Sequence, residues 1–432
     1  MFSTKIKSNQ HHIPRFFFYL GLLTIGQTII RPALSFTISD WFFLTSFLLT
    51  TAECLLKRKF EIKFPPYMFF GLFLFSIGGI LSSTFAIRPL ESALSLIKYL
   101  YLIAVWFWLG NVLLRTHNQI RTAIILWATS SALSGLGAIA QLIWIDILSI
   151  GDPLWNRMAG FTEHVNDLGG LTSIALIPSI MIITKSQNNL WLFFYSSICT
   201  FFISIGLLLS VSLSGILALI AGLLFWLILS RLKIKNILIS ILAVSLFCCA
   251  ISIQNFNDGF SFIDRFLTIF DNGIESETLQ TRIGTYIVAW ETIKAHPLLG
   301  VGLGPDVSLT QTGHAVHNIF LLNWYQSGLF GLIGISIVLY SIALQACKGI
   351  VNPVLSDKRD FGIALFASYI AFLVLGIAQP IFYNRFGWIS AALLLSLYSN
   401  YDEFNNIYSK RLSLHHMPFI FSNRKPTIIY KL

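Results

Sequence analysis

The stretch NIFLLNWYQSGLFGLIGISIVLYSIALQA, residues 318–346, decides the fold because it runs for 29 residues without a charged side chain. A helix rises 1.5 Å per residue, so about 20 apolar residues cross the roughly 30 Å hydrocarbon core of a bilayer. We therefore predict an all-α polytopic membrane protein with about twelve transmembrane helices. The other eleven predicted spans lie near residues 16–30, 41–56, 66–84, 93–113, 122–145, 168–184, 190–209, 213–230, 236–253, 361–379 and 386–400.

The composition excludes a water-soluble protein. The positive net charge can also be explained without a nucleic-acid partner. Of the 432 residues, 55% are hydrophobic and 11% are charged, whereas soluble domains carry about 25% charged residues. The formal net charge is +10. If both termini are cytoplasmic, 21 of the 29 Lys and Arg residues fall on the cytoplasmic side, where such residues accumulate, and seven fall outside. The basic excess therefore indicates orientation in the membrane.

The predicted spans divide the chain into a cytoplasmic arm (1–15), nine helices (16–253), a large periplasmic loop with short helices (254–317), three helices (318–400) and a basic cytoplasmic tail (401–432). The first hydrophobic run lacks a small-residue cleavage site, so we predict that it is retained as a span. Loops on a rigid helical scaffold commonly carry function. No Cys/His spacing resembles a metal site, and we predict neither a metal nor a cofactor.

A glycine-rich segment, HPLLGVGLGP at residues 296–305, ends the second short helix predicted in the large loop. No strand precedes it, so it is not a dinucleotide-binding motif. Two interpretations remain open. The segment forms a tight turn packed against lipid, or it forms a bend whose backbone N–H groups help to hold an anionic ligand.

The residues that follow resemble a known family. The chain has His317 and Asn318, followed by nine residues, Gly328, two more residues and Gly331. This pattern is similar to the signature of the O-antigen ligase and polymerase superfamily, whose members are membrane glycosyltransferases that use polyprenyl-diphosphate-linked sugars. The preceding stretch 282–302 and residues 160–166 resemble the same domain, so the resemblance covers roughly residues 155–345. This superfamily often carries an Arg beside a Ser and a Gly at the outer end of the span pair 190–230. Here residues 212–215 read Ser-Leu-Ser-Gly. If the family's arginine holds the donor phosphate, another cation must hold it in this chain, or the substrate differs.

The resemblance implies an inverting, metal-independent transfer of a glycan from an undecaprenyl-diphosphate-linked donor to an acceptor hydroxyl. The reaction would take place on the periplasmic face of a bacterial inner membrane. Ligation to lipid A core is the favoured reaction. Polymerisation of O-antigen, capsule or exopolysaccharide repeat units is the alternative. A transporter of polysaccharide or a lipid-linked solute is the alternative from another class, but we find neither the internal repeat nor the midplane ionisable residues common in transporters.

His317 is the candidate catalytic base, because an unperturbed imidazole titrates near pH 6.5 and is largely neutral around pH 7. Asn318 either orients the acceptor or caps the helix. For the diphosphate, Arg282 is the first candidate and Arg265 the second, because guanidinium groups bind phosphate oxygens through paired N–H donors. Either arginine can instead pair with nearby acids, at residues 264, 271, 275 and 277.

Two further cations are candidate substrate-binding residues. Arg157 lies in a second, smaller outer loop predicted at residues 146–167. Lys98 lies inside a predicted span, about two turns from Glu91, where a cation is costly and is therefore expected to have a function. Lys98 can reach a lipid phosphate, or its side chain can extend to the outer membrane interface.

Overall fold

The computed structural model describes residues 11–31, 36–60, 62–143, 151–152, 157–230, 277–304, 315–356 and 358–398. η1 is a π-helix, and η3 and η4 are 3-10 helices. In chain order the elements are α1 His12–Leu23, α2 Ile38–Leu56, α3 Pro66–Phe85, α4 Pro89–Leu100, η1 Tyr101–Val105, α5 Trp106–Leu113, α6 His117–Ile143, β1 Gly151–Asp152, β2 Arg157–Met158, α8 Val165–Lys185, α9 Leu190–Leu209, α10 Leu213–Leu229, α13 Glu277–Ala295, α15 Ile319–Val351, η3 Pro353–Leu355, α16 Arg359–Ala378, η4 Ile381–Tyr383 and α17 Arg385–Tyr398.

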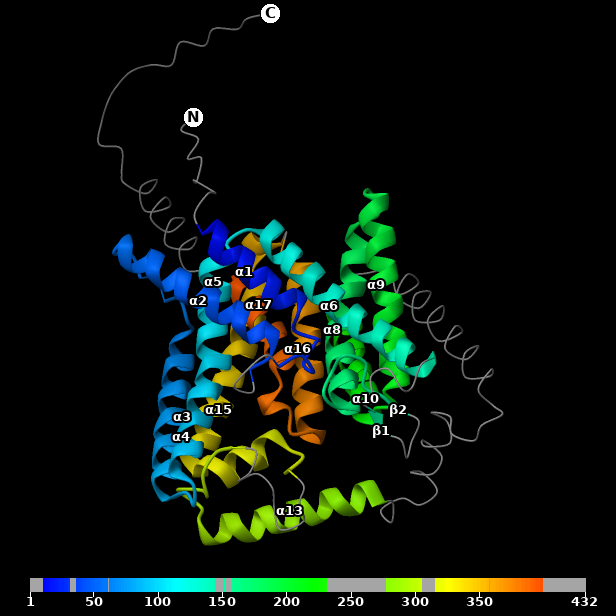
Figure 1. The fold of residues 1–432 in the computed structure, drawn as a ribbon. Coiled ribbons are helices and arrows are strands. Elements are labelled where there is room, and N and C mark those ends of the chain that lie inside the picture. Colours follow the sequence, from blue (N-terminus) through cyan, green and yellow to red (C-terminus); the bar gives the residue numbers. More distant parts are fainter. Residues whose placement is uncertain are drawn as a thin grey trace, which may run out of the picture.

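The helices form a bundle, and α13 lies across one end of it (Figure 1). In the described part of the chain, seven helices are long and apolar enough to cross a membrane. Each predicted span in that part overlaps a helix, the span 93–113 is formed by α4, η1 and α5 together, and the span 236–253 lies outside the described residues. The first helix is shorter than predicted, because α1 ends at Leu23, well before Arg31. The total number of spans and the location of the termini remain predictions.

Small residues let α3 and α15 approach closely. A methyl group added to Gly334 would lie 2.3 Å from the backbone nitrogen of Phe75, and one added to Gly78 would lie 2.5 Å from that of Gly331. Side chains at these glycines would therefore push the two backbones apart. Close approach through small residues is common between membrane helices, where packing replaces the hydrophobic effect. Gly331, part of the family-like signature, thus has a structural role.

Helix α15 is broken at Gly328, whose φ of 65° and ψ of −167° are not helical. At the break, the loop 297–304 exchanges hydrogen bonds with the helix. Leu329 N donates to Pro297 O (3.1 Å), and Tyr325 O accepts from Val301 N (3.1 Å). Gln326 O accepts from Gly302 N (3.0 Å). The loop therefore satisfies backbone groups that the break takes out of the helical pattern, as a broken helix at membrane depth requires.

The glycine-rich segment forms a turn at residues 297–299, as the first interpretation predicted, and the exchange opposes the second interpretation, a bend that holds an anionic ligand. The N–H groups of Val301 and Gly302 bond to carbonyls of α15, and Leu303 N bonds to Ser92 Oγ (2.7 Å), so these donors are not directed at an anionic ligand. The glycines at 300, 302 and 304 are buried against the protein and do not face lipid. They have positive φ values, which L side chains rarely adopt.

The break predicts a specific sensitivity to Gly328→Ala. The new methyl group would lie 2.0 Å from Leu298 O, at a backbone conformation that alanine rarely adopts. We expect a loss of at least about 2 kcal/mol of stability, seen as a lower Tm in detergent. The control is Gly376→Ala, whose methyl group would have no neighbour closer than Ile319 Cγ2 at 3.2 Å. Equal Tm values for the two variants would contradict the role of Gly328.

Candidate functional site

Several helices meet at residues 379–385, which connect α16 to α17 and are called the 379–385 linker below. Gln379 Nε2 donates to the side-chain oxygens of Ser212 (3.4 Å) and Ser214, at the turn between α9 and α10. Asn384 Nδ2 donates to Asp167 Oδ1 (2.6 Å) at the start of α8. The linker therefore joins elements that are far apart in the sequence.

The same linker contacts the broken helix. Gln326, two residues before the break, donates from Nε2 to Tyr383 Oη and to Gly304 O (3.2 Å). The ring of Tyr383 lies 5.2 Å from that of Tyr99 on α4, centroid to centroid. Burial raises the pKa of Tyr383, so the phenol stays protonated at physiological pH. A neutral, half-buried phenol thus connects the break in α15 to the linker.

His317 and Asn318 precede the first turn of α15. Asn318 Oδ1 accepts from the backbone nitrogens of Phe320 (2.9 Å) and Leu321 (3.0 Å), so this side chain caps the helix. His317 is half-buried, and its main-chain oxygen accepts a hydrogen bond from Tyr286 Oη of α13 (2.8 Å). Tyr286 Oη and Asn318 Nδ2 each also donate a hydrogen bond to Ile377 O, both at 3.5 Å. These contacts hold α13 and α16 against the segment that carries His317.

Arg282 lies four residues before Tyr286 on the same face of α13. Burial lowers the pKa of the Arg282 guanidinium, and the nearby Tyr286 raises it. Burial also raises the pKa of Tyr286, with Arg282 acting in the opposite direction. The two side chains therefore interact, and the guanidinium is partly removed from water, where its attraction for an anion is stronger. The four acids considered as partners for Arg282 have side chains outside the described part of the chain.

Arg157 lies on β2 and is buried, with 5% of its surface exposed. Its Nε donates to Ser210 O (2.9 Å), and its Nη2 donates to Asn166 Oδ1 (2.6 Å). A guanidinium is thus fixed at the turn between α9 and α10, next to the Ser-Leu-Ser-Gly sequence that departs from the family pattern. No local pattern could reveal this, because Arg157 and Ser210 are 53 residues apart.

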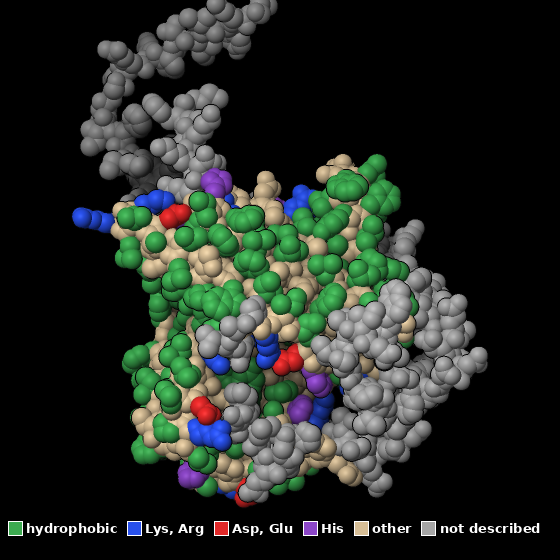
Figure 2. Space-filling view, in the orientation of Figure 1, with side chains coloured by type: hydrophobic (Ala, Val, Ile, Leu, Met, Phe, Trp, Pro, Cys, Tyr) green, Lys and Arg blue, Asp and Glu red, His purple; other side chains and the backbone are tan. Residues whose placement is uncertain are grey.

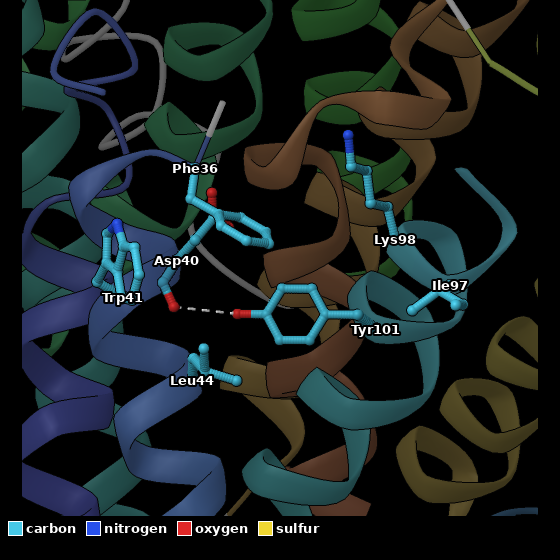
Figure 3. A pocket seen from close by; sticks show the side chains of 7 residues that line it. All are labelled: Phe36, Asp40, Trp41, Leu44, Ile97, Lys98 and Tyr101. Carbon is cyan, nitrogen blue, oxygen red and sulfur yellow. Dashed lines mark hydrogen bonds between the residues drawn. The ribbon is translucent and has the colours of Figure 1, made fainter. Parts of the chain in front are cut away.

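The remaining candidates are Lys98 and Arg265. Lys98 lines a pocket on α2 and α4, which are not the elements that carry His317 (Figure 3). Arg265 lies outside the described residues. Figure 2 shows charged and His side chains gathered around a hollow near α13, whereas hydrophobic side chains cover most of the surface farther from α13. Among the described residues, no group of three or more His, Cys, Asp or Glu side chains is placed to hold a metal ion.

Comparison with known proteins adds one match. A family model described as O-antigen ligase matches residues 198–336, from the middle of α9 to just beyond the break in α15. Residues 198–336 are therefore similar to the O-antigen ligase family over less than half of the chain. The resemblance to the O-antigen ligase and polymerase superfamily is therefore confirmed, and with the apolar helices it indicates a multi-pass membrane protein of a glycosyltransferase-like family. A search of curated proteins finds no relative of this chain.

Sequence reasoning missed several residues that join the helices around the candidate site. Tyr286 was overlooked, as were the polar residues of the 379–385 linker. The linker reads Gln-Pro-Ile-Phe-Tyr-Asn-Arg between two apolar helices. Polar and aromatic residues in so short a connection were a signal, although their partners on other helices could not be read from it.

The contact between Tyr286 and His317 predicts that Tyr286→Phe loosens α13. Removing a hydrogen bond of this kind costs about 1 kcal/mol, so amide exchange along α13 should become roughly fivefold faster. Hydrogen exchange measured by mass spectrometry on the purified protein tests this. Ile287→Ala is the control, because Ile287 is 57% exposed on another face of α13. An unchanged exchange rate in Tyr286→Phe would show that the bond does not hold α13.

Proposed function

We propose that this protein transfers a glycan from an undecaprenyl-diphosphate-linked donor to a hydroxyl of lipid A core, on the periplasmic face of a bacterial inner membrane. The observation that carries the proposal is the hydrogen bond from Tyr286 to the main chain of His317. It holds the face of α13 that bears Arg282 against the histidine of the family-like signature. A base next to a phosphate-binding cation is what displacement on a lipid diphosphate requires.

His317 acts as the base. Its neutral imidazole takes the proton of the acceptor hydroxyl as the oxygen attacks the anomeric carbon. The bond between that carbon and the diphosphate breaks, and the bonding electrons leave with the diphosphate. A single displacement inverts the configuration at the anomeric carbon. Asn318 contributes by capping α15, which fixes the main chain beside His317.

Arg282 and Arg157 stabilise the charge on the departing diphosphate, because each guanidinium can offer paired N–H donors to phosphate oxygens. In this proposal they neutralise the leaving group without a metal ion. Arg157 takes the role of the arginine missing near Leu213, since it lies beside Ser210 in the same turn. Arg265 remains the second candidate on the large loop. The description of the family supports lipid A core as the acceptor, and polymerisation of lipid-linked repeat units would use the same chemistry.

The reaction is tested by giving purified protein an undecaprenyl-diphosphate glycan with lipid A core. We expect glycan on the core, and we expect His317→Ala to reduce the rate at least about 100-fold while donor binding is retained. The control is His296→Ala, because His296 is exposed at the end of α13. An elongated lipid-linked glycan as product would identify a polymerase. Transfer by His317→Ala at the normal rate would remove the proposed base.

The cations make a separate prediction about the donor. Arg282→Ala should raise the KM for the donor roughly 10- to 100-fold, because a charged hydrogen bond to phosphate is lost. Arg282→Lys should restore only part of the affinity for the donor, since an ammonium keeps the charge but not the paired N–H donors. The control is Lys294→Ala, because the exposed Lys294 pairs with Glu291 (2.8 Å) on the same helix. An unchanged donor KM in Arg282→Ala would rule out this contact.

A further inference from the structure

One stripe of side chains on α13 faces the bundle. Arg282, Tyr286, Ala289 and Ile293 are spaced by four, three and four residues, so they lie on one side of the helix. Tyr286 Oη donates to the main-chain oxygen of His317 (2.8 Å). Ala289 and Ile293 are 0% and 3% exposed. This stripe is therefore the surface through which the protein holds α13.

A second stripe runs beside the first, one residue farther along the helix. It consists of Ile283, Ile287 and Trp290, which are 40%, 57% and 45% exposed. Trp290 lies at its border with the bundle, since its ring meets that of Trp324 on α15 edge to face, with centroids 5.8 Å apart. Large apolar side chains that are exposed together on one surface indicate an apolar partner.

The third side of α13 is polar. Gln280 and Glu291 are exposed there. Lys294 continues the apolar stripe by one turn, and its Nζ bonds to Glu291 Oε1 (2.8 Å), so its charge is directed toward the polar side. A lysine at a membrane interface directs its ammonium in this way, with its carbon chain along apolar surface. One side of α13 is thus fitted to protein, one to an apolar medium and one to water.

The loop after α13 fixes the helix at the end of two membrane spans. Leu303 N donates to Ser92 Oγ (2.7 Å), in the first turn of α4. The candidate spans Tyr67–Phe85 and Pro89–Leu113 end and begin at this turn. α13 runs across this end of the bundle (Figure 1). The helix therefore lies beside the boundary of the hydrocarbon core.

The exposed apolar surface of α13 continues onto a third span. Trp324 Nε1 donates to Pro297 O (3.0 Å), and the next residue, Leu298, is 55% exposed. Beyond the break in α15, Phe330 and Ile333 are 38% and 40% exposed. Exposed side chains of a membrane span lie against lipid chains, and α15 is such a candidate span. The apolar stripe of α13 is therefore joined to a lipid-facing surface.

We propose that α13 lies in the membrane interface at this end of the bundle, with Ile283, Ile287 and Trp290 against the hydrocarbon chains of the phospholipid leaflet. Interfacial helices bury an apolar face about 5–10 Å deep, and tryptophan is enriched at this depth. The partner is the lipid surface as a whole. This contact does not depend on glycan transfer. One consequence rests on the proposed function: the same helix would hold Arg282 at the depth of lipid phosphates.

The test places the photoreactive amino acid p-benzoylphenylalanine at one position at a time in the full-length protein. Each variant is reconstituted in nanodiscs of phosphatidylethanolamine and phosphatidylglycerol, illuminated, and analysed by mass spectrometry for covalently attached phospholipid. Position 287 probes the apolar stripe. Position 291 is the matched control one turn away, because the Glu291 side chain is 63% exposed on the polar side. Position 333 on α15 is the reference for contact with lipid.

We expect at least about fivefold more phospholipid attached at position 287 than at position 291, and an amount within roughly twofold of that at position 333. Position 283 should behave as position 287 does. No more lipid at position 287 than at position 291 would overturn the proposal. Attachment from position 287 to this chain or to a second copy of it, in place of lipid, would also overturn it, because protein would then cover the stripe.

Discussion

The exchange of backbone hydrogen bonds at Gly328 is the constraint on which the rest of the structure depends. Inside a membrane each backbone N–H and C=O needs a partner within the protein, so a broken helix requires another segment to supply the missing bonds. The loop 297–304 supplies them to Tyr325, Gln326 and Leu329. This fixes the loop, and with it the end of α13, against the first part of α15. His317 therefore belongs to a rigid assembly of α13, the loop and α15, although it lies at the end of the long outer loop.

The 379–385 linker extends this assembly to the other helices. Tyr383 meets Gln326 beside the break, Gln379 meets the turn between α9 and α10, and Asn384 meets α8. Arg385 reaches α2 through Asp40, at the edge of the α2–α4 pocket. Polar contacts are thus concentrated at the outer ends of the helices. Through Gln379 and Ile377, the end of α16 contacts both the turn that Arg157 binds and the segment that carries His317.

The helices were readily predicted, because an apolar run of sufficient length has few alternatives to a membrane helix. The signature around His317 was equally visible, and the family match supports it. Contacts between distant segments could not be predicted. The turn in the glycine-rich segment was predicted, but its partners at Tyr325 and Gln326 were not, because they belong to a helix whose break is not evident from hydropathy. The early end of α1 was missed for a related reason, since residues 24–30 are apolar enough to continue a helix but form turns instead.

The central claim is that a lipid diphosphate binds at the outer end of the bundle, between Arg282 and Arg157 and next to His317. A structure of the protein in a lipid nanodisc with an undecaprenyl-diphosphate glycan tests it most directly. The account predicts phosphate oxygens within hydrogen-bonding distance of both guanidinium groups, and the anomeric carbon on the side of His317. A diphosphate bound at the opposite end of the bundle, near Arg115 and Lys63, would contradict it.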